Sequence, residues 1–239
     1  MKNIADKTIG QIVTEDYRTA QVFEKHGLDF CCGGRRTVME ACAAKGIDPE
    51  ALAREIAMLG SRKSTGDNYK DWTPDFLIDY IINNHHNYVR NKLPELHIYA
   101  EKVAKVHGKN HPENVEILDR LEELASAMRD HMRKEEEILF PYVKQLVESE
   151  RRGVEPEAPE FGSAGKPVQM FEEEHEEAGE AMEEIRRLSN NFTVPDDACT
   201  TYEVLYQNLS EFRDDLHKHV HLENNILFPK ALELEKRLI

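Results

Sequence analysis

The most constraining feature of this sequence is one pattern that occurs twice. "HMRKEEEILFP" begins at His131, and "HVHLENNILFP" begins at His219, 88 positions further along. Each copy places a glutamate, Glu135 or Glu223, four residues after its histidine, so both side chains lie on one face of a helix. Apolar residues at steps of three and four extend each face, and Ile138 continues the first one. The repeat therefore predicts two helices whose buried faces each carry a histidine and a carboxylate.

Two further segments carry a histidine on an otherwise apolar face. His175 falls in step with Phe171, and His86 falls in step with Val89. The neighbouring His85 lies on a mixed row, so the periodicity favours His86. The four segments form two hairpins that turn near residues 110 and 195, and residues equidistant from a turn lie at one level. The four histidines are therefore expected to meet at the same height.

The chain is predicted to be all-α, because strand signals are almost absent and helix caps recur along it. Turn and linker residues divide it into a small helical domain and an antiparallel four-helix bundle. The expected boundaries are residues 1–60 for the small domain, 61–72 for a polar linker and 73–239 for the bundle. Short helices are expected near 15–25, 34–45 and 48–60, and long helices near 74–106, 112–147, 168–188 and 196–236.

Four imidazoles and two carboxylates on inward faces indicate a metal centre. Buried charges are tolerated when they are paired or bind metal. Six nitrogen and oxygen donors without a thiolate suit hard or borderline ions and exceed what one tetrahedral zinc takes. Two metal ions with bridging glutamates fit the count, and iron is favoured over manganese and zinc. The predicted ligands are His86, His131, Glu135, His175, His219 and Glu223.

A single histidine–glutamate pair on a helix is more often a surface contact than a ligand pair. The second copy and the two level-matched histidines favour the metal site over that interpretation. Polar residues off the apolar faces are expected to be solvated. These are Glu136, Glu137, His26, His97, His107, His111, His217 and His221.

The charge balance excludes several classes of function. The chain has 46 acidic and 31 basic residues, for a formal charge of −15, which repels nucleic acid and anionic membranes. Neither a membrane-spanning run nor a secretory signal is seen. Four cysteines in 239 residues, two of them adjacent, do not indicate a disulfide framework. A cytoplasmic protein is expected.

The adjacent cysteines Cys31 and Cys32 lie in "LDFCCGGRR". They are placed at the start of the helix expected at 34–45, where backbone N–H groups would lower a thiol pKa. Such a pair can ligate metal, accept a transferred ion or cycle through oxidation. The alternative is that two small residues simply pack a tight Gly-Gly turn. Cys42 is expected in the core, and Cys199 has no identifiable partner.

Taken together, "GLDFCCGG", "EEEHEEAGE" and the two repeats resemble the iron-sulfur cluster repair di-iron proteins, also called the repair of iron centres family. The resemblance covers nearly the whole chain. It implies a paired-cysteine domain followed by a hemerythrin-like bundle, two non-haem iron ions with carboxylate bridges, and a cytoplasmic homodimer. It selects His86 rather than His85, and it implies the same six ligands. It gives Cys31 and Cys32 a redox or iron-transfer role.

The resemblance implies a stress-response protein that repairs iron-sulfur clusters after nitrosative or oxidative damage, by supplying iron. Its expected partners are damaged iron-sulfur proteins or a cluster scaffold, with nitric oxide or dioxygen as small ligands. One alternative is a di-iron enzyme that binds or reduces nitric oxide, because six ligands underfill two octahedral ions. Another is a redox or gas sensor. Oxygen-carrying hemerythrins are a poorer match, since they use more histidine.

Overall fold

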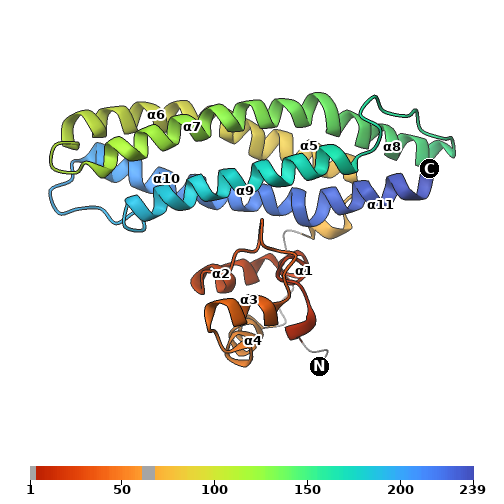
Figure 1. Cartoon of the computed structure of the whole chain (residues 1–239), viewed down its shortest axis with the longest axis horizontal. Coiled ribbons are helices and arrows are strands. Elements are labelled where there is room, and N and C mark those ends of the chain that lie inside the picture. The colour runs from red at the N-terminus through yellow and green to blue at the C-terminus, as the bar shows by residue number, and fades with distance from the viewer. Residues whose placement is uncertain (1–3, 61–67) are drawn as a thin grey trace.

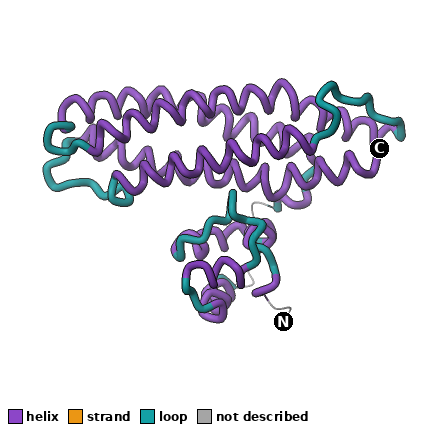
Figure 2. Tube along the Cα trace, in the orientation of Figure 1, coloured by secondary structure: helices purple, strands orange, loops and turns teal. Residues whose placement is uncertain are grey.

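The computed structural model describes residues 4–60 and 68–239, and every regular element in these ranges is helical. The sole bridge among them joins Thr8 to Thr37. Figure 1 shows an elongated bundle with a smaller helical region packed against its side, and Figure 2 shows that loops are confined to the helix ends and to that region. The predicted all-α class is confirmed.

The N-terminal region, residues 4–60, contains short capped helices. Capping boxes at Thr8 and Thr37 begin α1 (Ile9–Glu15) and α3 (Val38–Lys45), and Asp48 caps α4 (Pro49–Met58). The other elements are η1 (Ile4–Asp6), η2 (Tyr17–Thr19) and α2 (Ala20–Lys25). Helix α1 is absent from the predicted helices, although Thr8 and Gln11 are its capping-box residues. The helix expected at 34–45 corresponds to α3, which begins only at Val38.

Four long helical rods form the bundle. Its elements are η3 (Tyr69–Asp71), α5 (Pro74–Tyr80), η4 (Ile81–His86), α6 (Asn87–His107), α7 (Glu113–Lys134), η5 (Glu135–Leu139), α8 (Phe140–Arg152), α9 (Gly165–Leu188), α10 (Thr200–Leu222), η6 (Glu223–Leu227) and α11 (Phe228–Leu238). The elements η4, η5 and η6 are π-helical turns inside rods that otherwise match the predicted helices.

The apolar core of the bundle is split into two clusters. One is centred on residues such as Leu93, Met128 and Leu216 and continues into the N-terminal region. The other includes Phe140 and Phe228. The predicted ligands occupy the level between them, so a buried polar layer divides the core.

The predicted linker falls largely on residues 61–67, which lie outside the described residues. Tyr69 and Trp72 pack against the second apolar cluster. The domain division at residues 60 and 73 stays a prediction.

Candidate metal centre

The structure brings the six predicted ligands together in the middle of the bundle. They form two groups whose donor atoms lie within 4.8 Å of one another, one containing His86 and His219, the other His131 and His175. Glu135 and Glu223 belong to both groups. All six residues are at least 97% buried. We call these six residues the cage.

Each glutamate of the cage lies between histidines from different rods. Glu223 places Oε1 3.1 Å from His219 Nε2 and Oε2 3.1 Å from His175 Nε2. Glu135 Oε2 lies 3.3 Å from His131 Nε2 and 3.4 Å from His86 Nε2. All four histidines therefore turn Nε2 inward, which is the arrangement expected of donors that share a central pair of cations.

The charges in the cage are balanced internally. Burial acts to lower the pKa of His86 and of His131, but the facing carboxylates raise both to about 10. Burial and Glu223 act to raise the pKa of Glu135, but His131 and His86 outweigh them and hold it at about 2. Burial lowers the pKa of His219. At neutral pH, two imidazolium ions thus offset two carboxylates, which avoids the cost of several kcal/mol for an isolated buried ion.

Several inward atoms of the cage suit a cation better than a hydrogen bond. His86 Nε2, both oxygens of Glu135 and Glu223 Oε2 are buried and find no hydrogen-bond partner among the described residues. A buried polar atom without a partner costs roughly 1–3 kcal/mol. His131 Nε2 and His175 Nε2 are directed at each other 2.9 Å apart, and two neutral imidazole nitrogens in that arrangement can bind a shared cation. This donor set fits two metal ions.

Three of the cage residues lie at π-helical turns. His86 ends η4, Glu135 begins η5 and Glu223 begins η6. A π-turn inserts one residue and shifts the following side chains around the helix. For this reason Ile138, expected on the buried face, is 39% exposed, while Leu139 is fully buried.

Polar side chains outside the cage hold three of its histidines. Nδ1 of His86 lies 2.6 Å from Glu136 Oε1, and Nδ1 of His131 lies 2.8 Å from Glu174 Oε2. Nδ1 of His175 lies 2.8 Å from Asn224 Oδ1. Such partners fix the ring and leave Nε2 free to bind a cation.

None of these three partners is among the predicted site residues. The expectation that Glu136 is solvated is wrong, because its side chain is only 25% exposed and contacts His86. Their positions in the sequence point to them, because each partner is next in sequence to a cage residue. Glu136 follows Glu135, Glu174 precedes His175 and Asn224 follows Glu223.

Other histidines lie outside the two groups. His85 is buried, bonds Asp215 through Nδ1 at 2.9 Å and stacks on His219 with ring centroids 5.6 Å apart. His221 was expected to be solvated, but it is 99% buried against Tyr17 and Phe30 of the N-terminal region. Burial accordingly lowers the pKa of His221 to about 3. The side chain of His97 is 42% exposed, as expected.

The adjacent cysteines lie in a loop rather than at a helix start. We call residues 27–37, between α2 and α3, the cysteine loop. Its Asp29 accepts the backbone N–H groups of Cys31 and Cys32 at 2.9 and 3.1 Å. The hydrogen bond to Cys32, burial and nearby Asp29 raise the pKa of Cys31 well above its ordinary value. The expected lowering of this pKa by a helix N-terminus is therefore wrong for Cys31, because α3 begins only at Val38.

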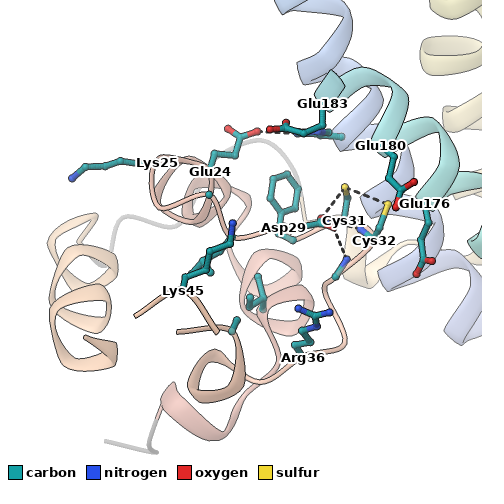
Figure 3. A pocket seen from close by; sticks show the side chains of 18 of the residues that line it. Glu24, Lys25, Asp29, Cys31, Cys32, Arg36, Lys45, Glu176, Glu180 and Glu183 are labelled. Carbon is teal, nitrogen blue, oxygen red and sulfur yellow. Dashed lines mark hydrogen bonds and ion pairs between the residues drawn. The ribbon is translucent and has the colours of Figure 1, made fainter. Parts of the chain in front are cut away.

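The cysteine loop reaches the bundle beside the cage. Cys32 Sγ lies 3.5 Å from the carbonyl oxygen of His175. Around this contact, the N-terminal region and α9 line a cleft of about 1100 Å³. Figure 3 shows Cys31 and Cys32 beside Glu176 and Glu180 of α9, with Asp29 on the opposite side of the cysteines. Asp29, Cys31 and Cys32 place three donor atoms within 4.8 Å of one another.

The remaining cysteines differ in exposure. Cys42 is fully buried, as expected. Cys199 is exposed, and its Sγ lies 3.2 Å from Nε2 of His107 at the far end of the bundle.

Comparisons with known proteins define the class. Residues 77–231 match the family model described as the hemerythrin HHE cation binding domain, and residues 5–59 match the model ScdA_N, described as a domain of unknown function. The long rods and their buried His/Glu groups are thus a hemerythrin-like cation-binding bundle. This confirms the predicted fold class.

The relatives define the family more closely. The chain is 37% identical over 230 residues to the iron-sulfur cluster repair proteins YtfE of Citrobacter koseri, Escherichia coli and Shigella boydii. Each alignment covers 95% of this chain and 97% of the relative. The chain belongs to the YtfE-type iron-sulfur cluster repair proteins, which confirms the resemblance drawn from its motifs. No helix among the described residues is long and apolar enough to cross a membrane.

Proposed function

We propose that this chain holds two iron ions in the cage and supplies iron to iron-sulfur clusters damaged by nitrosative or oxidative stress. The observation that carries the proposal is the pair of buried groups that share Glu135 and Glu223. They occur in a chain whose relatives are named iron-sulfur cluster repair proteins.

The donor set favours iron that can leave. Imidazole and carboxylate donors without thiolate suit ferrous and ferric iron. Six side chains do not fill two six-coordinate ions, so positions remain for small ligands such as water, nitric oxide or dioxygen. Iron is here the cargo of the protein, and the partners are damaged iron-sulfur proteins or a cluster scaffold.

The cysteine loop is the proposed acceptor for iron as it leaves the cage. Asp29, Cys31 and Cys32 form a three-donor group, and Cys32 lies against the backbone of His175. The raised pKa of Cys31 keeps its thiol protonated at neutral pH. An arriving cation would have to displace that proton, so the group suits brief binding better than storage.

The decisive experiment replaces both shared glutamates by their neutral isosteres. The double variant Glu135→Gln, Glu223→Gln keeps the side-chain volume but removes both negative charges from the cage. We expect metal content to fall from about two ions per chain to near zero and restoration of a nitric oxide-damaged cluster enzyme to be lost. Glu137→Gln is the matched control, because the side chain of Glu137 is 61% exposed.

Undiminished restoration by the double variant would refute the proposal. The same anaerobic samples separate iron supply from the enzyme alternative. Stoichiometric transfer of iron supports the proposal, whereas repeated turnover of nitric oxide without loss of iron would replace it with nitric oxide reduction.

A further inference from the structure

One side chain contacts the cage and the cysteine loop at the same time. Asn224 follows Glu223 in η6 and is 91% buried. Its Oδ1 lies 2.8 Å from Nδ1 of His175, and its Nδ2 donates to the carbonyl oxygen of Cys31 at 3.4 Å. An amide has one accepting and one donating end. The carbonyl of Cys31 therefore selects the amide orientation in which Oδ1 faces His175.

That orientation matters for the ring of His175. When Oδ1 accepts from Nδ1–H, the ring proton stays on Nδ1 and Nε2 keeps its lone pair directed into the cage. If the amide rotates by half a turn, Nδ2 faces Nδ1 and the two donors oppose each other. The contact to Cys31 thus acts on His175 through Asn224.

The cysteine loop is seated on η6 by further contacts. Asn225 donates from Nδ2 to the carbonyl oxygens of Phe30 and Cys31, each at 3.2 Å. Two glycines make room for it, because a Cβ at Gly10 would lie 2.2 Å from Asn225 Oδ1 and one at Gly34 would lie 2.6 Å from the same atom. The Cβ at Gly34 would also lie 2.5 Å from the carbonyl oxygen of Phe30. This fit between backbone and amide indicates a specific docked position.

The coupling reaches only one half of the cage. His175 belongs to the group with His131, and both Asn224 and Cys32 contact His175. In the other group, His86 is held by Glu136 of the bundle, and His219 stacks on His85, also of the bundle. Among the hydrogen bonds of the described residues, none joins the cysteine loop to either of them.

We propose that Asn224 is a positioning residue that couples docking of the cysteine loop to the metal position formed by His131 and His175. This inference rests on the proposed function. With the loop docked, His175 is fixed and the ion is held. When the loop lifts, the amide is freed, His175 loses its oriented acceptor, and the ion beside the cysteines is released first.

The coupling can be isolated by a double-mutant cycle. Gly34→Ala loosens the loop. Asn224→Asp keeps an oxygen for Nδ1 of His175 but loses the N–H that reaches Cys31. The measurement is the rate at which a chelator removes Fe²⁺ anaerobically from protein loaded with two ions per chain.

In the wild type we expect two phases of about one ion each. Gly34→Ala should speed one phase by about 10-fold, the low end of the effect of losing a partner of a metal-bound histidine. In the Asn224→Asp background the same Gly34→Ala change should have no further effect, since the link between loop and ring is already broken. Asn224→Leu, which loses both contacts, should speed that phase by about 10- to 100-fold whether or not the loop is loosened.

A second readout uses reciprocity, because a loop that affects the ion must be affected by it. Cys32 should react with a maleimide more slowly in the loaded protein than in the metal-free protein, and Asn224→Asp should abolish that difference. Cys199, at the far end of the bundle, is the internal control. Direct binding of iron by the thiols would protect Cys32 equally in Asn224→Asp, so equal protection would overturn the inference.

The inference would also be overturned if Gly34→Ala speeds iron removal equally in the wild-type and Asn224→Asp backgrounds. Failure of the coupling is distinguishable from failure of the proposed function. A wild type that does not bind two ions, or that does not restore a damaged cluster, fails the function itself. A wild type that binds and restores normally but shows no coupling fails only this inference.

Discussion

Glu135 and Glu223 determine the electrostatics of the centre, because each is fully buried and faces histidines from different rods. Without a cation, the carboxylates keep His86 and His131 protonated, with pKa values of about 10. A metal ion binds only the neutral imidazole, so the ion competes with protons for the same nitrogen atoms.

This competition gives a pH dependence with a definite sign. Below pH 10, His86 and His131 of the metal-free protein carry protons that metal binding must displace. Metal affinity should therefore be weakest in acid and should rise as the pH approaches 10. Titration calorimetry in buffers of different ionisation enthalpy should show release of about two protons per pair of ions near pH 7. Affinity independent of pH between 6 and 9 would contradict the charge balance described for the cage.

The pKa of Cys199 is lowered, whereas that of Cys31 is raised. The hydrogen bond from His107 lowers the pKa of Cys199 to about 7, so near neutral pH about half of it is thiolate. We expect alkylation of Cys199 to follow an apparent pKa near 7. His107→Gln should return the pKa toward its ordinary range and slow alkylation at pH 7 by roughly 10-fold. His97→Gln is the control, and an unchanged rate in His107→Gln would show that the pair does not activate the thiol.

At the scale of helices, apolar periodicity predicts the four rods correctly but not the side chains that follow a π-turn. The four rods and the level of their histidines follow from apolar periodicity, which does not depend on exact hydrogen bonding. A π-turn changes which carbonyl each N–H meets, and apolar periodicity alone does not mark that change. For this reason the periodicity predicts Ile138 on the buried face after Glu135, where the structure places Leu139.

A proline follows two of these turns and is expected to maintain them. Pro229 lacks the N–H that an α-helix would direct at the carbonyl of Asn225. Pro229→Ala restores that donor, favours an α-turn over η6 and rotates Glu223 away from its place. Metal affinity should fall by about 10-fold while the metal-free protein is no less stable, because alanine is the better helix former.

Pro94→Ala is the matched control for Pro229→Ala, because Pro94 lies inside α6 away from any π-turn. It should change stability without changing metal affinity. Calorimetric unfolding and metal titration of both variants give the comparison. Equal affinities in the two variants would show that the prolines do not maintain the turns.

At the scale of the whole molecule, the N-terminal region docks on the rods that carry the cage. The paired cysteines are evident in the sequence, where a helix start is the expected source of their reactivity. Their position beside His175 cannot be predicted from local sequence, because that contact depends on long-range packing of His221, Asn225 and two glycines. Nothing in the local sequence indicates that His221 is buried, because only packing against Phe30 of the N-terminal region removes it from water.

Metal removal tests the stability of the whole fold. A ligand that binds only the folded state raises its stability in proportion to the logarithm of ligand concentration. Chelation should therefore lower the unfolding temperature, yet circular dichroism should show an unchanged helix content at 25 °C. Loss of helicity on chelation would mean that the metal is needed for folding, contrary to the internal charge balance.

The balance of charge in the metal-free cage bears on whether one molecule can be used more than once. On the proposed function, the cage takes up two protons when its iron leaves, so the protein stays folded and can bind iron again. On that proposal each copy acts repeatedly, at a rate limited by the arrival of iron and of a base that accepts the released protons.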